Sequence, residues 1–346
     1  MRVSWVWGLV LLLIGCQEQS SPSLGYHKIS GTTMGTYYTI TWSDGPPIAW
    51  KDSIDNLLFA FNEEVSTYIA SSTIGRFNQS ATGILIDTSI NRDFWENFQL
   101  SIKLVEKTKG AFDPTVMPLV NYWGFGYTEK KAVSQVDSQR VNSLLPLIGM
   151  DNLHLEYLGN GNLYQLNKNH PDVQLDFSAI AKGFGVDRIA EWLEKKGVKN
   201  YLVDIGGEMR SYGSNPKGGD WVIGINEPLE GGAADAVFQT LKLSGKSVAT
   251  SGNYRNFYEL DGSKYSHTIS PWTGYPQQLP ILSVTVVASD CATADALATA
   301  CMVLGHEEGL ALIEKIADIE AYFIYNNGKD ELSVVMTSGF QTFLND

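Results

Sequence analysis

The segment 294–300 places a carboxylate and a hydroxyl one helical turn apart. Asp295 and Thr299 are separated by four positions, so in a helix they share one face. The residues around them are mostly alanines, which would leave that face open to a ligand. Carboxylate and hydroxyl oxygens suit a hard cation such as Mg²⁺. A Thr bonded to a backbone carbonyl and an Asp near a helix start would give the same pattern, so both alternatives stay open.

A second polar segment, residues 175–185, leads from an expected strand into an expected helix. Asp176 stands at the strand end, and Lys182 falls in the first helical turn. The backbone N–H groups of that turn, together with the lysine, could hold a phosphate. The glycine spacing matches neither a Walker A loop nor a GxGxxG fingerprint, which argues against the common nucleotide-binding folds. Taken by itself, Lys182 is explained more simply as a solvated helix residue.

Two loops complete the set of candidate segments. Residues 110–126 contain Asp113 before a proline, which favours extended backbone, and an aromatic patch that could stack a planar ring or fill a core corner. Residues 250–255 precede a polar loop at 267–274 that contains His267, one of five histidines. His267 is a candidate proton acceptor, and a histidine that is merely hydrogen-bonded is the alternative.

The composition limits which chemistry is possible. The chain has 346 residues, of which 44% are hydrophobic and 18% charged, as expected for a globular protein rather than a disordered one. Its 38 acidic and 25 basic residues give a formal net charge of −13. This balance argues against nucleic-acid binding, because such binding depends on Lys and Arg contacting phosphates. An anionic substrate would need a local cation, and a metal ion is the first candidate.

The N-terminus has the form of an export signal. Arg2 precedes an apolar run over residues 3–14, which is shorter than the roughly 20 residues of a membrane span. The run ends in Gly15 and Cys16 and resembles a bacterial lipobox. We therefore expect residues 1–15 to be a lipoprotein signal peptide, Cys16 to carry lipid and residues 16–25 to form a tether. The protein would then be a membrane-anchored lipoprotein facing the periplasm, with the outer membrane favoured. A plain secretory signal or a buried helix is the alternative.

The elements that must position the candidate residues follow from hydrophobic periodicity. Alternating runs predict strands at 37–42, 83–87, 153–158, 201–205, 221–225, 282–288 and 321–325. Helical periodicity predicts helices at 48–66, 92–108, 180–196, 293–304 and 307–316. Strict βαβ alternation is missing, which predicts an α+β fold of mainly antiparallel sheets in one domain over residues 26–346. Two lobes could hold the site between them. Cys291 and Cys301 are ten residues apart in an expected helical region, too far to bridge, and are expected in the core.

The candidate segments follow one another in a specific order. From the N-terminus the chain contains GTTMGTY at 31–37, STY at 66–68, GAFDPT at 110–115, LDFSAIAKG at 175–183, DIGGE at 204–208, TSGNYR at 250–255, HTISPWTG at 267–274 and ADALATA at 294–300. This series resembles the ApbE family of FAD:protein FMN transferases. The resemblance extends over about residues 26–340, nearly the whole chain after the tether.

The resemblance implies a reaction and its partners. FAD would be the substrate and Mg²⁺ the cofactor, and the FMN half of FAD would pass to a Thr hydroxyl of an acceptor flavoprotein with release of AMP. The acceptors would be subunits of membrane redox complexes of the Na⁺-translocating NADH:quinone reductase or Rnf type. FAD pyrophosphatase activity and a non-catalytic flavin-binding lipoprotein are the alternatives.

The resemblance also assigns roles to individual residues. Asp295, Thr299 and the carbonyl of Ala179 match the metal ligands of the family. Asp295 is also assigned to catalysis, with His267 as the base for the acceptor hydroxyl and Lys182 as a positive charge near the phosphates. The FAD contacts would be Met34, Tyr68, Ala111, Phe112, Asp113, Asp176, Lys182, His267 and Ile269.

One position departs from the family pattern. The loop usually reads His-x-x-Asp-Pro, whereas this chain has Ser270 before Pro271. If that aspartate orients the loop, the geometry around His267 would differ here.

Overall fold

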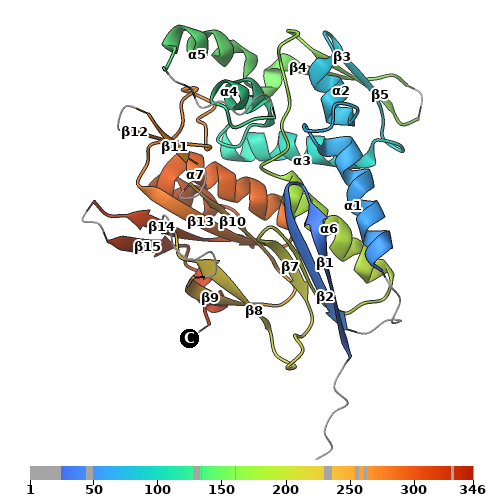
Figure 1. Cartoon of the computed structure of the whole chain (residues 1–346), viewed down its shortest axis with the longest axis vertical. Coiled ribbons are helices and arrows are strands. Elements are labelled where there is room, and N and C mark those ends of the chain that lie inside the picture. The colour runs from blue at the N-terminus through green and yellow to red at the C-terminus, as the bar shows by residue number, and fades with distance from the viewer. Residues whose placement is uncertain are drawn as a thin grey trace, which may run out of the picture.

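A sheet of eight strands forms the centre of the fold (Figure 1). The structure, a computed structural model, describes residues 25–43, 50–127, 133, 135–159, 161–229, 236–253, 257–260, 263–328 and 331–345. The predicted signal peptide, the predicted lipid site Cys16 and the tether up to residue 24 lie outside these residues. Neighbouring strands are antiparallel throughout, in the order β1 (Tyr26–Thr33), β2 (Thr36–Ser43), β6 (Asn200–Ile205), β7 (Glu208–Tyr212), β10 (Ser247–Gly252), β13 (Ile281–Ala288), β14 (Glu320–Asn326) and β15 (Leu332–Met336).

Three long helices pack on one face of the sheet: α1 (Lys51–Val65), α6 (Ala181–Lys195) and α7 (Cys291–Ile313). The opposite face is covered by the strand pair β8 (Trp221–Asn226) and β9 (Val237–Leu243) and by the short helix η4 (Phe340–Phe343). Successive side chains of β10 lie on opposite faces of the sheet: Val248 packs with β8 and β9, whereas Ala249 packs with α7.

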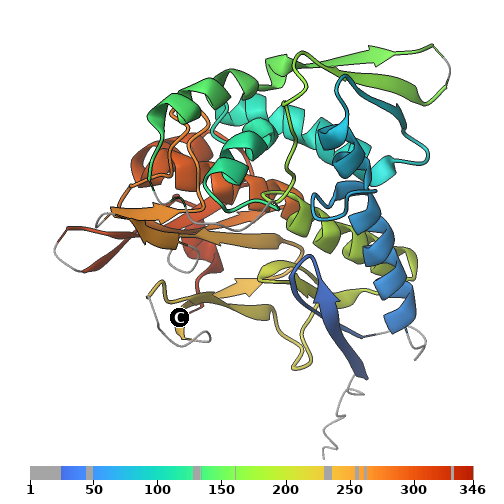
Figure 2. The ribbon, with the colours of Figure 1, turned by 45° about the horizontal axis from the view of Figure 1, so that its top comes forward.

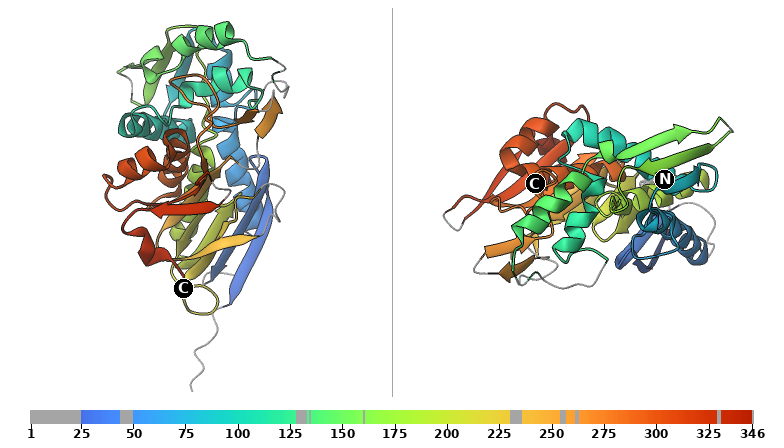
Figure 3. Two further views of the ribbon diagram at one scale, coloured as in Figure 1. Left: turned by 90° about the vertical axis from the view of Figure 1, so that its left-hand side faces the viewer. Right: turned by 90° about the horizontal axis from the view of Figure 1, so that it is seen from above.

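A second group of elements lies beyond α7, at the top of Figure 1 and at one end of the molecule in Figure 3. It contains α2 (Thr73–Gln79), α3 (Arg92–Thr108), α4 (Met117–Tyr122), α5 (Ser138–Leu144), the short helices η1 (Pro114–Val116), η2 (Leu145–Leu147) and η3 (Met150–Asn152), and the sheet β3 (Gly83–Asp87), β5 (Leu163–Lys168) and β4 (Leu153–Tyr157). Figure 2 shows β4 and β5 projecting from this end. The hairpin β11 (Phe257–Leu260) and β12 (Ser263–Ser266) lies beside α4.

Helix α7 runs through the main hydrophobic core. Its alanines and Leu297 pack against the sheet on one side and against the helices of the second group on the other. By length and composition α7 is the one helix among the described residues that could cross a membrane, but it is mostly buried and serves as the core helix. Because the core is continuous through α7, the two groups of elements form one domain with a shared interior.

The predicted α+β class is confirmed, and every predicted strand and helix corresponds to an observed element. The two helices predicted at 293–304 and 307–316 meet at Gly305, whose backbone (φ 84°, ψ 177°) breaks the helical path of α7. Cys291 and Cys301 are free and fully buried, as expected.

Two glycines of α6 allow close packing, and they provide a matched pair of substitutions. A Cβ at Gly183 would collide with the Cys291 carbonyl and lie 2.8 Å from the Cα of Ala292, both backbone atoms of α7. We expect Gly183→Ala to lower the free energy of unfolding by about 1–3 kcal/mol, the usual cost of overpacking. Gly185→Ala would crowd only the flexible end of the Met34 side chain, at 2.8 Å, and would touch Ile205 Cδ1 at an ordinary contact distance of 3.4 Å, so it should be close to neutral. Urea unfolding of both variants tests this, and equal losses would contradict it.

Candidate active site

Three charged side chains from three elements meet where the start of α6 approaches α7. Lys182 Nζ lies 2.5 Å from Glu208 Oε1 of β7 and 3.9 Å from Asp295 Oδ1 of α7. Both carboxylates are buried. The cluster therefore places two buried carboxyl groups beside a single lysine whose side chain is 31% exposed, and one more cation would help to keep both carboxyl groups ionised.

The electrostatics of the cluster follow from burial and from these contacts. Burial raises the pKa of Glu208 to about 7 and also raises that of Asp295, and in each case Lys182 opposes the shift. Burial alone would lower the pKa of Lys182, but Asp295 and Glu208 outweigh it, so the pKa is raised and the ammonium stays charged. The second carboxylate oxygen of Glu208, Oε2, is buried without a hydrogen-bond partner in the described part of the chain.

The donor atoms around Asp295 fit a hard divalent cation. Thr299 stands one turn further along α7, and its hydroxyl lies 3.3 Å from the Ser251 hydroxyl of β10. Ala179 lies in the turn just before α6. All these donors are oxygens, as Mg²⁺ prefers. Within the described residues no group of three or more His, Cys, Asp or Glu side chains is placed to hold a metal.

The alanines around Asp295 do not have the role expected from the sequence. Ala294, Ala296, Ala298 and Ala300 are buried in the core and leave no open face. Their small size instead lets α7 lie close to its neighbours, and the cluster is reached from the start of α6.

The segment before α6 is fixed by α2 and by the 110–115 loop. The side-chain amide of Asn78 donates to the Leu175 carbonyl (2.8 Å) and accepts from the Leu175 N–H (2.7 Å). The Asp176 N–H donates to the Pro114 carbonyl at 2.7 Å. Ser178 donates to the Asp176 carboxylate through its N–H and its hydroxyl, and burial raises the pKa of Asp176 against these bonds. Asp176 is thus held beside the 110–115 loop. Both had been predicted to contact FAD, so they would have to lie close together.

The residues of the 110–115 loop that were predicted to contact FAD differ in how buried their side chains are. Ala111 and Phe112 are buried in the main core, so only their backbone atoms could face a ligand. Asp113 accepts hydrogen bonds from the Thr115 N–H (2.8 Å) and hydroxyl (2.6 Å), which begins η1. Tyr68 is 64% exposed, and partial burial together with the nearby Asp176 carboxylate raises its pKa. Tyr68 is therefore the ring on this side that a flavin or adenine could contact.

The aromatic patch of residues 122–125 supports the loop that carries His267. Trp123 is fully buried, stacks on Tyr265 (5.4 Å between ring centroids) and donates from Nε1 to the Gly274 carbonyl at 2.7 Å. Phe125 lies edge-on to His267 at 6.4 Å. Of the two alternatives for this patch, stacking on a planar ring or filling a corner of the core, the structure shows the second for Trp123. Ile269 is also buried and forms a bridge with Pro276, so its side chain helps to fix the loop.

The His267 loop is joined to the rest of the site at two places. The Gln277 side chain donates to the Val303 carbonyl of α7 at 2.6 Å, while the Gln277 N–H donates to the Thr268 carbonyl at 2.8 Å. The Trp272 indole nitrogen lies 3.5 Å from where a Cβ of Gly110 would be, so this loop also meets the 110–115 loop. Its position relative to α7 is thus set by direct contacts.

Ser270 stabilises the turn at the position where the family usually has aspartate. Its hydroxyl accepts from the Thr273 N–H at 3.3 Å, a role that an aspartate can also fill. We expect Ser270→Asp to retain activity. Ser270→Ala should cost about 1 kcal/mol of loop stability and lower turnover several-fold. Steady-state kinetics of the two variants test this, and an inactive Ser270→Asp would contradict it.

Met34 lies at the turn between β1 and β2, with positive φ (50°). Its thioether packs against Gly185, three residues after Lys182 on α6. Met34 therefore packs against the helix that carries Lys182, and Lys182 lies near Asp295, one turn from Thr299. Asp176 hydrogen-bonds to the 110–115 loop, and Trp272 of the His267 loop approaches the same loop. Tyr254 and Arg255 of the TSGNYR motif lie outside the described residues.

Two residues of the site were not given a role from the sequence. Glu208 appears there only as the end of the DIGGE motif, and the DIGGE segment turns back on itself so that Glu208 begins β7 beside Lys182. Ser251 was part of a segment expected to be a loop, and it lies in β10 next to Thr299. A carboxylate directly after a Gly-Gly turn is the one signal that could have indicated Glu208.

Comparison with known proteins gives a consistent result. The model of the ApbE family matches residues 34–323. The FAD:protein FMN transferase of Vibrio cholerae is 40% identical over 321 residues (90% of this chain and 90% of the relative), and that of Escherichia coli K12 is 33% identical over 341 residues (96% and 95%). The solved flavin transferase ApbE from Vibrio cholerae matches with a TM-score of 0.81 at 37% identity, covering 93% of this chain and 100% of that one. The Pseudomonas stutzeri flavinyl transferase ApbE, in its apo form, matches with a TM-score of 0.81 at 32% identity, covering 93% and 98%. This chain therefore belongs to the ApbE family.

Proposed function

We propose that the protein is a Mg²⁺-dependent FAD:protein FMN transferase that attaches FMN to a Thr hydroxyl of an acceptor flavoprotein and releases AMP. The observation that carries the proposal is the buried cluster of Lys182, Glu208 and Asp295, with Thr299 one turn from Asp295. The likeness to FAD:protein FMN transferases over about nine-tenths of the chain supports it.

The proposed reaction is a displacement at phosphorus. The acceptor hydroxyl oxygen forms a bond to the FMN phosphorus, the bond from that phosphorus to the bridging oxygen breaks, and the bridging oxygen leaves with AMP. Mg²⁺, held by Asp295, Thr299 and the Ala179 carbonyl, would supply charge neutralisation of the phosphate oxygens. Lys182 places a second positive charge at the start of α6, where backbone N–H groups also favour an anion.

His267 is proposed to take the proton of the attacking hydroxyl. It lies on the loop that Trp123 and Gln277 hold against α4 and α7, so its ring is carried by a fixed support. A positioned general base contributes about 10²–10⁴ to the rate of such a step. Tyr68 and Met34 would contact the planar rings of FAD at the two sides of the site.

The location and the acceptors are part of the same proposal. The lipobox at Cys16 supports an exported lipoprotein anchored on the periplasmic side of a membrane. Its acceptors would be flavoprotein subunits of membrane redox complexes of the Na⁺-translocating NADH:quinone reductase or Rnf type. Labelling of cells with a radioactive lipid precursor should mark the wild type and not a Cys16→Ala variant, and equal labelling would contradict the lipid site.

The decisive experiment uses the purified protein with FAD, Mg²⁺ and an acceptor domain bearing the target Thr. AMP release and flavin fluorescence of the acceptor band in a denaturing gel are followed together. The proposal expects a fluorescent acceptor, lost with EDTA and lost when the target Thr is replaced by Val. AMP without a labelled acceptor would instead indicate FAD pyrophosphatase activity, and FAD binding without AMP would indicate a flavin-binding protein.

A further inference from the structure

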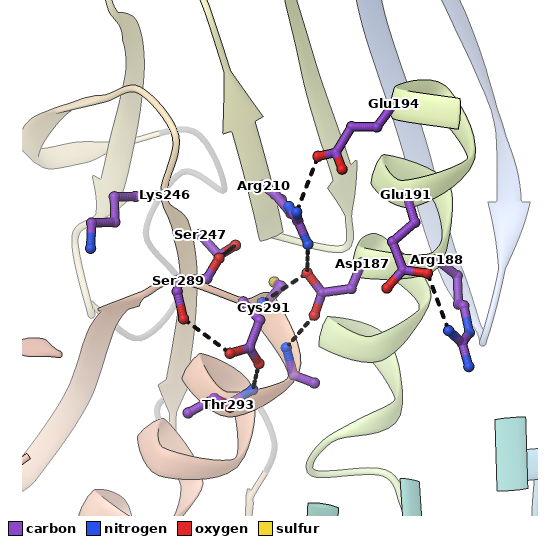
Figure 4. Close-up of polar contacts among 12 residues, drawn as sticks. Asp187, Arg188, Glu191, Glu194, Arg210, Lys246, Ser247, Ser289, Cys291 and Thr293 are labelled. Atoms are coloured by element: carbon purple, nitrogen blue, oxygen red, sulfur yellow. Dashed lines mark hydrogen bonds and ion pairs between the residues drawn. The ribbon is translucent and has the colours of Figure 1, made fainter. Parts of the chain in front are cut away.

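Helices α6 and α7 complete each other's N-termini. Asp187 of α6 accepts hydrogen bonds from the Cys291 and Ala292 N–H groups, at 3.0 and 2.9 Å, in the first turn of α7 (Figure 4). In return, Asp295 of α7 accepts a 3.0 Å bond from the Gly183 N–H in the first turn of α6. Helix α6 has no side-chain cap of its own, because its N-cap residue is Ile180. The α6 start therefore depends on a carboxylate from α7. The α7 start has a cap of its own, because Asp290 accepts from the Thr293 N–H at 2.8 Å, and Asp187 binds the two preceding amides that Asp290 leaves open.

The Asp187 carboxylate is also connected to β7. Arg210 donates to it at 2.9 Å and reaches Glu194 with its other terminal nitrogen at 3.1 Å (Figure 4). Arg210 stands two residues after Glu208, so the two side chains share one face of the strand. The Glu194 end borders a surface cleft of about 450 Å³, whereas Asp187 is only 6% exposed.

These contacts place Asp187 at the junction of all three elements that form the candidate site. Lys182 comes from α6, Asp295 from α7 and Glu208 from β7, and Asp187 lies on the first element and bonds to the other two. The α7 amide of Ala292, which Asp187 binds, lies about one helical turn before Asp295. On β7, Arg210 lies two residues after Glu208. Within the described part of the chain Asp187 forms no hydrogen bond or ion pair with Lys182, Asp295 or Glu208, and the proposed mechanism does not use it.

We propose that Asp187 is a positioning residue, which holds the first turn of α7 so that Asp295 stays in register with Lys182 and Glu208. The inference rests on the proposed function for its consequence, because Asp295 is there assigned to the cation. Mg²⁺ demands near-ideal ligand geometry, so a shift of the α7 start would weaken its binding. Loss of residues that orient metal ligands typically costs about 10–100-fold in metal affinity.

Arg188 provides a matched control on the same helix. It is the next residue, is also buried, and pairs with Asp93, Glu96 and Glu191. None of these partners belongs to α7 or β7. Replacing Arg188 therefore breaks an equally dense set of ion pairs without touching the start of α7.

The test compares Asp187→Ala, Asp187→Ala/Arg210→Met and Arg188→Met in the full-length protein. Hydrogen exchange of the Cys291, Ala292 and Gly183 amides, measured without metal, reports the two crossed caps, and titration calorimetry gives the Mg²⁺ affinity. We expect both Asp187 variants to lose protection at residues 291 and 292 and at Gly183 and to bind Mg²⁺ about 10–100-fold more weakly. Arg188→Met should melt earlier but keep wild-type exchange at these amides and wild-type affinity. The double variant also removes Arg210, which the single variant leaves paired with Glu194 alone, so agreement between the two assigns the effect to the lost cap.

Unchanged exchange at Gly183 in Asp187→Ala would overturn the inference, and so would an equal loss of Mg²⁺ affinity in Arg188→Met. If the wild type bound no Mg²⁺ while Gly183 lost protection in Asp187→Ala, the positioning role would stand and the proposed function would fail. The two failures are thereby separated.

Discussion

Replacing Asp295 with asparagine is expected to abolish Mg²⁺-dependent turnover while the protein stays folded. Asparagine keeps an oxygen that can accept the Gly183 N–H, so the start of α6 remains capped. It removes the negative charge that lies beside Lys182 and is assigned to the cation. Since a bound metal contributes several kcal/mol to stabilising charge in such reactions, the rate should fall by about 10³-fold or more.

Asp295→Ala is the matched variant, because it loses the cap as well as the charge. It should be equally inactive and, in addition, less stable than Asp295→Asn by about 0.5–2 kcal/mol. AMP release against Mg²⁺ concentration and thermal unfolding separate the two effects. Wild-type turnover in Asp295→Asn would show that the cation binds elsewhere.

Replacing His267 with glutamine is expected to lower FMN transfer by about 10²–10⁴-fold, the range of general-base catalysis. The Mg²⁺ affinity should change little, because His267 comes from the loop beside Phe125, whereas the residues assigned to the cation lie on α7 and just before α6. Single-turnover transfer to the acceptor at saturating FAD and Mg²⁺ tests this.

His306→Gln is the control for the His267 substitution. His306 stacks on Tyr325 at 4.0 Å between ring centroids, after the break in α7 at Gly305, so its loss should leave transfer unchanged. Equal activity of His267→Gln and wild type would mean that another group takes the proton.

The sequence predicted the fold class and the main elements because periodicity is strong where one face is buried. Helix α3 and strand β3 agree with the predicted boundaries residue for residue. The strands that were missed are β1, β5, β7, β9, β10, β11, β12 and β15. Among them, β1 and β10 contain many Ser, Thr and Gly residues and show little alternation of apolar and polar types. Their strand conformation is determined by pairing with β2 and β13, which no local pattern reveals.

The sequence predicted several residues of the candidate site, but it did not predict the contacts between residues that lie on different elements. The spacing of Asp295 and Thr299 could be read within one helix, and Lys182 could be placed in a first turn. That Glu208 would pair with Lys182 depends on how β7 runs beside α6, which the linear sequence does not contain. Asp187 gave a weak signal, as a charged residue between the buried Val186 and Ile189 of α6, and its partners on α7 are 104 and 105 residues away.

The crossed caps of α6 and α7 have a consequence for how the molecule folds. The two sets of bonds close loops of 104 and 112 residues, and contacts across such long loops form late because the chain must first be brought together. The α6 start and the first two amides of α7 are satisfied only when the two helices have docked, so both should fray in a partly folded chain. The oxygen atoms assigned to the cation therefore come into register only once α6 and α7 have docked. A nascent chain that has made α6 and β7 but not yet α7 already holds Lys182 and Glu208, yet it lacks Asp295 and Thr299 and so has no cation site.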